Sequence, residues 1–221
     1  MTFNKEVEFI LSKFSHEIRN PLTTLYSTIQ LIEMKNPEVK QMKYWPNLAY
    51  DIEYMNQLLN EFSNFAKSEQ LTLTSIDMLS FLERLSLSFA SSIAQSEVHY
   101  TSKIDPCISK ITVDKTKLQE VFFNLLKNAF DATKPNGSIF LHAFMEDSQL
   151  VVTIQDNGCG IGPEQLSTIF EPFVTYKKEG TGLGLAICNH IVNAHGGSIS
   201  VESELGVGTT FRVTLPTKQE C

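Results

Sequence analysis

Ser15-His16-Glu17-Ile18-Arg19-Asn20-Pro21-Leu22-Thr23 is the stretch from which the fold of this chain can be worked out. It lies in a segment whose apolar residues, among them Phe14 and Ile18, have the spacing of a helix. His16 stands two residues from each of these, about 200° round the helix, so we expect it to point to solvent. Pro21 removes a backbone donor and clashes with the carbonyl of Glu17, which predicts a kink within one turn of His16.

Two helices are expected in this part of the chain, with a turn between Asn36-Pro37 and Trp45-Pro46. The second helix carries a strict a/d seam: Trp45, Leu48, Ile52, Met55, Leu59, Phe62 and Ala66. The first has a similar stripe: Val7, Leu11, Phe14, Ile18, Leu25, Ile29 and Ile32. Two helices with one seam each cannot close a core. The hairpin therefore either forms a four-helix bundle with a second copy or packs on its own downstream domain.

The heptads stop around Lys67-Ser68-Glu69-Gln70, where we expect a hinge between a domain of residues 1–69 and a domain of residues 70–221. Beyond the hinge, helical patterns alternate with strand patterns. The predicted helices are 77–94, 114–132 and 184–194, and the predicted strands are 138–145, 149–155, 198–202 and 209–215. This order indicates an α+β sandwich with helices on one face of a mixed sheet.

The composition is that of an ordinary globular protein, since 42% of its 221 residues are hydrophobic and 19% are charged. No apolar run approaches the roughly 18 residues of a membrane span. A net charge of −7 argues against nonspecific binding to nucleic acid, which depends on Lys and Arg. Cys107, Cys159, Cys188 and Cys221 have no metal-binding spacing, which is typical of reduced thiols in a cytoplasmic protein.

Three polar residues of the helix 114–132 carry the first sign of a binding site. Asn124, Asn128 and Asp131 are at i, i+4 and i+7, so they share one face. Amides on a helix that faces a sheet are costly to bury unless a ligand or partner satisfies them. Alone, the same spacing would also fit a polar stripe facing solvent.

Two glycine-rich loops follow. Asp156-Asn157-Gly158-Cys159-Gly160-Ile161-Gly162 comes directly after a predicted strand, where glycines let a ligand approach the backbone. Gly180-Thr181-Gly182-Leu183-Gly184-Leu185 opens a predicted helix, and such an N-terminus suits a phosphate. These glycines do not form a Rossmann loop, because the glycines of a Rossmann loop come after the first strand of a βαβ unit, near an N-terminus. They do not form a Walker A loop either, because no Gly-Lys-Ser/Thr follows them.

Taken together, these blocks resemble a bacterial sensor histidine kinase of two-component or phosphorelay signalling. The resemblance extends from the segment around His16 to Gly208-Thr209-Thr210-Phe211. It implies that residues 1–69 are a dimerisation and histidine phosphotransfer hairpin, forming a dimeric four-helix bundle. It also implies that residues 70–221 are a catalytic ATP-binding domain, an α+β sandwich of the Bergerat (GHKL) type. The implied function is ATP-dependent autophosphorylation of His16, followed by phosphoryl transfer to an aspartate of a response regulator.

The resemblance also assigns roles to the catalytic residues. His16 receives the phosphoryl group on Nε2, and Glu17 is the general base, since an adjacent carboxylate can hold the Nδ1–H tautomer. Asn20 matches the position that orients water when some of these kinases dephosphorylate their partner. Asn124 organises the γ-phosphate and the catalytic geometry.

For the nucleotide, the resemblance implies ATP with Mg²⁺. Asn128 holds the metal through its carbonyl oxygen, a hard ligand of the kind Mg²⁺ prefers. Asp156 accepts a hydrogen bond from the adenine amine, and Thr209 supports this aspartate. Residues 174–179 form a lid in which one of two lysines contacts phosphate. The remaining residues expected at the nucleotide are Asp131, Gly158, Gly160, Lys177, Lys178, Gly180, Thr181, Gly182, Leu183 and Gly184.

The partners implied are a second copy of the chain, the receiver domain of a response regulator, and an inhibitory protein docking on the helical bundle, with no nucleic acid and no membrane contact. Two stretches of the sequence are similar to those of kinases from endospore-forming bacteria, namely Glu171-Pro172-Phe173-Val174-Thr175 and Asn193-Ala194-His195-Gly196-Gly197. This similarity favours a sporulation phosphorelay kinase. The family's input domain, often membrane-bound, is not recognisable here. The chain is therefore expected to be the cytoplasmic catalytic part of such a kinase or an unusually short one.

Three other functions are compatible with parts of this pattern. An ATPase of the same nucleotide-binding superfamily, such as a chaperone or topoisomerase, carries a glutamate four residues before the metal-binding asparagine, where this chain has Asn124. A related serine kinase would lack the His16-Glu17 pair. A nonenzymatic scaffold would not need the whole set of motifs. Fold analogy alone does not separate these functions, whereas His16 and Asn124 favour the histidine kinase.

Overall fold

The computed structural model describes residues 5–177 and 180–217, and within residues 5–16 it describes only the course of a helix. The chain divides into two compact units, residues 1–67 and residues 68–221. Each is described by itself. In the described ranges no helix combines the length and the apolar character needed to cross a membrane.

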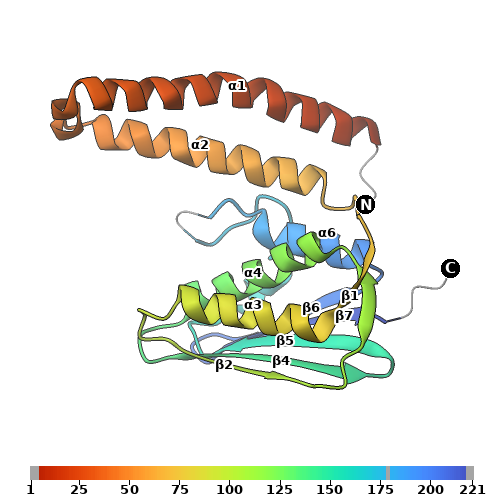
Figure 1. Ribbon diagram of the computed structural model, residues 1–221. Helices are drawn as coiled ribbons and strands as arrows, with labels where there is room; N and C mark the ends of the chain where they lie inside the picture. Colours follow the sequence, from red (N-terminus) through yellow and green to blue (C-terminus); the bar gives the residue numbers. More distant parts are fainter. Residues whose placement is uncertain (1–4, 178–179, 218–221) are drawn as a thin grey trace. The chain divides into compact units, whose positions relative to one another are not determined.

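The first unit is a helical hairpin of α1 (Lys5–Lys35), the short 3₁₀ helix η1 (Pro37–Gln41) and α2 (Trp45–Ala66) (Figure 1). The two predicted helices and the turn between them are confirmed. The helix α1 is continuous through Pro21. Prolines stand in the first turn of η1 and of α2, where a missing N–H costs nothing.

The seam between α1 and α2 is only partly covered. Leu22 and Ile29 of α1 and Ile52 of α2 are buried. Arg19 fastens the two helices, because its Nη2 donates to Asn60 Oδ1 and to Ser63 Oγ, each at 3.1 Å. Three other seam residues, Leu25, Leu48 and Met55, remain 50%, 46% and 41% exposed. The hairpin therefore presents an apolar stripe that its own two helices do not cover.

The second unit is built on a five-stranded mixed sheet with the order β2-β4-β5-β7-β6. Its strands are β2 (His99–Ile104), β4 (Ser138–Glu146), β5 (Gln149–Asp156), β6 (Ser198–Glu204) and β7 (Gly208–Pro216). Only β2 and β4 are parallel. β1 (Thr74–Asp77) and β3 (Lys110–Val113) form a separate antiparallel ladder. The four predicted strands are confirmed, and β1, β2 and β3 are additional to them.

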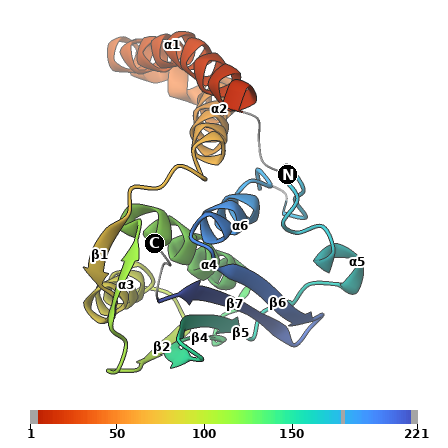
Figure 2. The ribbon, with the colours of Figure 1, turned by 90° about the vertical axis from the view of Figure 1, so that its right-hand side faces the viewer.

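Three helices cover one face of this sheet, α3 (Met78–Ser92), α4 (Lys115–Ala132) and α6 (Gly184–Ala194), as Figures 1 and 2 show. A fourth, α5 (Pro163–Leu166), is a single turn. The core lies between these helices and the sheet, and Phe122 and Leu125 of α4 are fully buried in it, as is Leu150 of β5. The predicted α+β sandwich, with helices on one face of a mixed sheet, is confirmed.

A buried histidine ties the end of α6 to the start of α4. His195 Nε2 accepts a hydrogen bond from the backbone N–H of Asp114 at 2.9 Å, and its Nδ1 lies 2.7 Å from the carbonyl oxygen of Ile191. Since Nε2 accepts, the proton is on Nδ1 and the ring is neutral. The Asp114 carboxylate caps α4 by accepting from the Lys117 N–H, and it also accepts from the Thr72 N–H.

Candidate active site

The helix α4 carries two unlike faces. Leu118, Val121, Phe122, Leu125, Leu126 and Ala129 are buried in the core. Asn124 and Asn128 are half-buried at the margin of this face, and Asp131 is exposed. The amides expected from the spacing therefore lie where a ligand can reach them rather than inside the core.

Asn124 faces the first residue of α6. A Cβ atom placed on Gly184 would lie 4.0 Å from the side-chain carbonyl of Asn124 and would meet nothing closer. Asn124 also forms a hydrogen bond with the thiol of Cys188, one turn further along α6. Complete burial raises the pKa of this thiol to about 12, so Cys188 remains protonated, and its Sγ donates to the carbonyl of Val121 at 3.7 Å.

The N-terminus of α6 begins beside Asn124 and has the features that favour an anion. In the described part of the chain, no side chain caps this helix end. The first N–H groups of a helix have no partner within the helix, and the helix dipole favours a negative charge there. Thr181 Oγ1 accepts from the N–H of Leu183 at 3.3 Å, and this hydrogen bond holds the two residues that precede α6 on either side of Gly182. A phosphate group fits this position by its charge and its acceptors.

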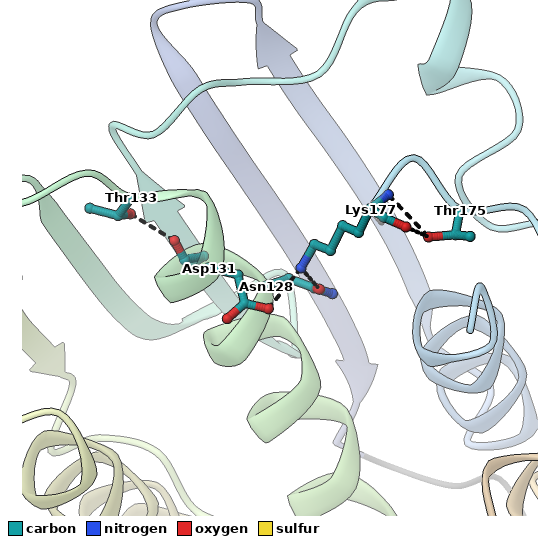
Figure 3. A network of polar contacts seen from close by, with 6 residues as sticks. Asn128, Asp131, Thr133, Thr175 and Lys177 are labelled. Atoms are coloured by element: carbon teal, nitrogen blue, oxygen red, sulfur yellow. Dashed lines mark hydrogen bonds and ion pairs between the residues drawn. The ribbon is translucent and has the colours of Figure 1, made fainter. Parts of the chain in front are cut away.

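The loop before α6 is closed at its base and attached to α4. The N–H of Phe173 donates to the carbonyl of Gly182 at 3.1 Å, and both residues have a positive φ, 65° and 73°. Further along the loop, Lys177 Nζ donates to Asn128 Oδ1 and to Asp131 Oδ2, each at 2.9 Å (Figure 3). Of the two lysines predicted in this loop, Lys177 thus reaches the polar face of α4. Lys178 lies outside the described residues.

The loop after β5 surrounds a buried carboxylate. Asp156 is 5% exposed, and its Oδ1 accepts from the Gly158 N–H at 2.8 Å. Burial raises the pKa of Asp156, and hydrogen bonds from the backbone of Gly158 and Thr209 offset part of the rise. The loop is held against the end of α4, where the Cys159 N–H donates to the carbonyl of Ala132 at 3.1 Å.

Two glycines of this loop are required by close packing. A Cβ on Gly158 would lie 2.4 Å from the carbonyl oxygen of Ala132, and one on Gly160 would lie 2.0 Å from that of Glu204. Gly160 also has a φ of 69°, a conformation that favours glycine. The Asp156 loop is therefore fixed between the end of α4 and the turn that joins β6 to β7.

The backbone of Thr209 forms a hydrogen bond with Asp156, whereas the Thr209 hydroxyl contacts a different residue. The hydroxyl lies 2.8 Å from Ser203 Oγ. Ser203 also accepts from the Ile161 N–H at 2.8 Å and donates to the Gly208 carbonyl at 2.9 Å. Ser203 was not predicted from the sequence. Alternation along β6 places Ser203 on the half-buried face with Ile199 and Val201, but its contact with Thr209 depends on the pairing of β6 with β7.

A hollow of about 620 Å³ at this end of the sheet is bordered by Asp156 and Thr209 but lies mainly on the other face. Its lining includes Gln155 and Thr210, which alternate with those two residues and therefore point away from α4. The polar groups of α4, α6 and the loops converge on the helix-covered side. We therefore assign the candidate site to that side and not to the hollow.

The remaining predicted residues belong to the first unit. Glu17 and Asn20 are exposed on α1. His16 lies within α1, but its side chain is outside the described residues. The Asn20 carbonyl accepts from the Thr24 hydroxyl at 3.1 Å, one turn after Pro21.

Comparison with known families gives two matches. Residues 7–71 match the family described as the His Kinase A (phospho-acceptor) domain. Residues 113–219 match the family described as histidine kinase-, DNA gyrase B- and HSP90-like ATPase. The two matches follow one another along the chain and include most of its length.

Relatives of known function are similar over nearly all of this chain. The sporulation kinase D of Bacillus subtilis (strain 168) is 35% identical over 206 residues, which are 91% of this chain and 40% of that protein. The signal transduction histidine-protein kinase AtoS of Escherichia coli (strain K12) is 32% identical over 208 residues, 94% of this chain and 34% of that protein. The chain thus spans less than half the length of these two relatives.

Two solved structures extend the comparison. Full-length ShkA in complex with AMPPNP has a TM-score of 0.80 and 26% identity, covering 96% of this chain and 46% of that one. The histidine kinase ThkA in complex with the response regulator protein TrrA has a TM-score of 0.67 and 25% identity, covering 95% of this chain and 61% of that one.

Proposed function

Because the chain belongs to the sensor histidine kinase family, which its two family matches and its relatives show, we propose that it transfers the γ-phosphoryl group of ATP to His16. From His16 the group passes to an aspartate of a response regulator. The relatives are longer proteins, so the activity, the substrate and the partners of the whole protein are part of this proposal.

One observation carries the proposal, namely that three separate blocks of sequence converge around α4. The first residue of α6 faces Asn124, Lys177 of the preceding loop contacts Asn128, and the Asp156 loop is attached at Ala132. A nucleotide has three parts that such an arrangement suits: a base, a phosphate chain and an associated metal. No single motif would favour ATP as strongly as their convergence on one helix.

The adenine is proposed to lie against Asp156. Its exocyclic amine can donate to the carboxylate oxygen that the Gly158 N–H does not occupy. Guanine has an oxygen at the corresponding position, and an oxygen beside a carboxylate has no proton to share. Gly158 and Gly160 hold the loop in place, and the backbone of Thr209 supports the carboxylate.

The phosphates are proposed to lie between the N-terminus of α6 and the polar face of α4. Gly180, Thr181, Gly182, Leu183 and Gly184 supply the backbone that leads into α6. Asn128 Oδ1 and Asp131 Oδ2 fit a cation, since they already share the ammonium of Lys177. Asn128 would hold Mg²⁺, which in this position neutralises charge on the β- and γ-phosphates.

In the phosphoryl transfer, His16 Nε2 attacks the γ-phosphorus. A P–N bond forms while the bond from that phosphorus to the bridging oxygen breaks, and ADP leaves with the electron pair. The ring then loses its Nδ1 proton to Glu17, the proposed general base. Asn124 orients the γ-phosphate, and catalysis is mainly positioning and charge neutralisation. Asn20, on the same face of α1 as His16, would orient water when the partner is dephosphorylated.

The partners follow from the first unit and the relatives. The exposed seam residues Leu25, Leu48 and Met55 support a homodimer whose two hairpins form a four-helix bundle. The complex of ThkA with TrrA supports a response regulator as the phosphoryl acceptor. Similarity to sporulation kinase D supports a role in a sporulation phosphorelay. We also propose that an inhibitory protein docks on the helical bundle.

The test is incubation with γ-³²P-labelled ATP and Mg²⁺, together with His16→Gln and Asn128→Ala variants. The account predicts protein-bound label that is lost in acid, survives alkali and is absent from both variants. Label that survives acid and persists in His16→Gln would instead indicate a serine kinase. Free phosphate released by a protein that carries no label would indicate an ATPase.

A further inference from the structure

Lys177 joins the loop before α6 to the polar face of α4. Its Nζ lies 2.9 Å from Asn128 Oδ1 and 2.9 Å from Asp131 Oδ2. Figure 3 shows the side chain extending from the loop so that its ammonium lies between the two oxygens. The contact is partly exposed, with 49% of the lysine side chain and 39% of the aspartate side chain accessible.

The backbone on either side of Lys177 is held by local hydrogen bonds. Thr175 Oγ1 accepts from the N–H of Lys177 at 3.2 Å, and the Lys177 carbonyl accepts from the Gly180 N–H at 3.2 Å. Nearby, the hydroxyl of Tyr176 lies 2.9 Å from that of Thr168. The ammonium of Lys177 has two acceptors on α4, which sets it apart from a lysine side chain that contacts only water.

An amide oxygen and a carboxylate oxygen that share one ammonium are also the ligands of a hard divalent cation. Asn128 Oδ1 is the oxygen through which the proposed function binds Mg²⁺. An ammonium at 2.9 Å and a metal cannot both occupy the space in front of this oxygen, because they would repel each other and overlap sterically. Their binding to Asn128 is therefore mutually exclusive.

We propose that Lys177 is an internal competitor of the metal: its ammonium occupies the cation position between Asn128 and Asp131, and Mg²⁺ bound with the nucleotide displaces it. The inference rests on the proposed function of this same site and adds to it a link between metal binding and the loop. Displacement frees the ammonium while it remains tethered beside the phosphates. Lys177 thereby exchanges its contact with Asn128 and Asp131 for a phosphate contact that depends on the nucleotide.

The test uses a fluorescent ADP analogue, which has no γ-phosphate and so cannot turn over. With the analogue at a fixed concentration, the measured quantity is the Mg²⁺ concentration that gives half of its maximal binding. Lys177→Met keeps the length of the side chain and removes the competing charge. We expect its Mg²⁺ midpoint to be about threefold lower than that of the unaltered protein, a factor in keeping with one partly exposed ion pair. Lys177→Arg retains a charge that can bridge the two oxygens, so its midpoint should stay close to that of the unaltered protein.

A second readout needs neither nucleotide nor metal. Without both, hydrogen exchange at the Gly180 amide, which bonds to the Lys177 carbonyl, should be about threefold faster in Lys177→Met and little changed in Lys177→Arg. The matched control is Lys103→Met, which removes an exposed lysine from β2 and should alter neither readout.

The outcomes separate the inference from the proposed function. If every protein binds the analogue with Mg²⁺ but the midpoint of Lys177→Met is unchanged or higher, the competition is wrong and the nucleotide site stands. A higher midpoint would assign Lys177 to phosphate binding, and an unchanged midpoint would leave it with no role in binding the metal. If none of the proteins binds the analogue at any Mg²⁺ concentration, the proposed function fails and the inference fails with it.

Discussion

Gly184 on α6 faces Asn124 on α4 across an open gap, because a Cβ on Gly184 would stay 4.0 Å from the Asn124 carbonyl group and meet nothing closer. The protein itself therefore has room for a methyl group at this position. In the proposed account the same space receives a phosphate, and the two glycines at either end of Leu183 serve different purposes. Gly182 has a φ of 73°, and a Cβ there would lie 2.6 Å from the backbone of Phe173.

Gly184→Ala and Gly182→Ala should therefore separate binding from folding. We expect Gly184→Ala to keep or raise the free energy of unfolding, by up to about 1 kcal/mol, while weakening ATP binding because the methyl group occupies the phosphate position. Gly182→Ala should lower the free energy of unfolding by about 1–2 kcal/mol or more. Urea unfolding and nucleotide titration measure the two effects. Unchanged ATP affinity in a folded Gly184→Ala protein would argue against this position for the phosphates.

Ser203 should support the Asp156 loop. Ser203→Ala leaves the Ile161 N–H and the Thr209 hydroxyl without their shared partner, which should cost about 1–3 kcal/mol of stability and weaken adenine binding. Ser200→Ala is the matched control, since Ser200 is exposed on the same strand. Thermal unfolding and AMP binding provide the comparison. Equal effects of the two substitutions would show that the Ser203 network is unimportant.

Stability should fall as the pH is lowered from 7 to 5, in part through His195. Burial lowers the pKa of His195 below its ordinary value of 6.5, although the Ile191 carbonyl and the charge of Asp114 oppose the shift. Below pH 6.5 the unfolded chain takes up a proton at this histidine that the folded protein does not, so unfolding becomes easier.

His195→Gln tests this pH dependence, because an amide can still accept from Asp114 and donate to Ile191 but does not titrate in this range. The difference in unfolding free energy between pH 7 and pH 5 should become smaller in the variant. It should not vanish, because burial also lowers the pKa of His190. An undiminished difference would show that His195 does not contribute.

The cysteines should differ sharply in reactivity. Cys107 and Cys159 are exposed, whereas Cys188 is fully buried with a pKa raised to about 12. Since the thiolate is the reactive form, iodoacetamide at pH 8 should alkylate the first two in the folded protein and reach Cys188 only after unfolding. Peptide mass spectrometry assigns each site. Early alkylation of Cys188 would show that α6 is not packed against α4 as described.

The exposed seam on α2 should mediate self-association. Leu48→Glu combined with Met55→Glu places charges on the apolar stripe and should convert a dimer into a monomer in sedimentation equilibrium. Asn47→Glu, at an exposed position beside the seam, is the control and should remain dimeric. A dimer that survives the double substitution would mean that another surface holds the two copies together.

The parts of the fold that could be predicted are those set by local periodicity. The seam from Trp45 to Ala66 predicted α2, and alternating apolar residues predicted β4, β5, β6 and β7. β2 was not predicted, because in His99–Ile104 only Tyr100 and Ile104 are even partly buried and the residues between them are polar. Its place in the sheet comes from parallel pairing with β4, which is distant in sequence. β1 and β3, of four residues each, are too short for a periodic signal.

The candidate site shows the same division. The shared face of Asn124, Asn128 and Asp131 follows from helix geometry, and Gly184 at the start of α6 follows from the glycine pattern. Which lysine reaches α4 could not be predicted, since Lys177 and Asp131 are 46 residues apart and their contact depends on the path of the loop. The hydroxyl network of Ser203 likewise depends on the pairing of β6 with β7.

The most direct test of the central claim is to locate the phosphoryl group on the chain. After reaction with ATP and Mg²⁺, trypsin cleavage at Lys13 and Arg19 releases Phe14–Arg19, which contains His16 and Ser15. The account predicts that mass spectrometry at neutral pH finds one phosphoryl group on this peptide, that fragmentation assigns it to His16, that acid removes it, and that Asn128→Ala lacks it. A phosphoryl group on Ser15 that survives acid, or one found only on other peptides, would contradict the account.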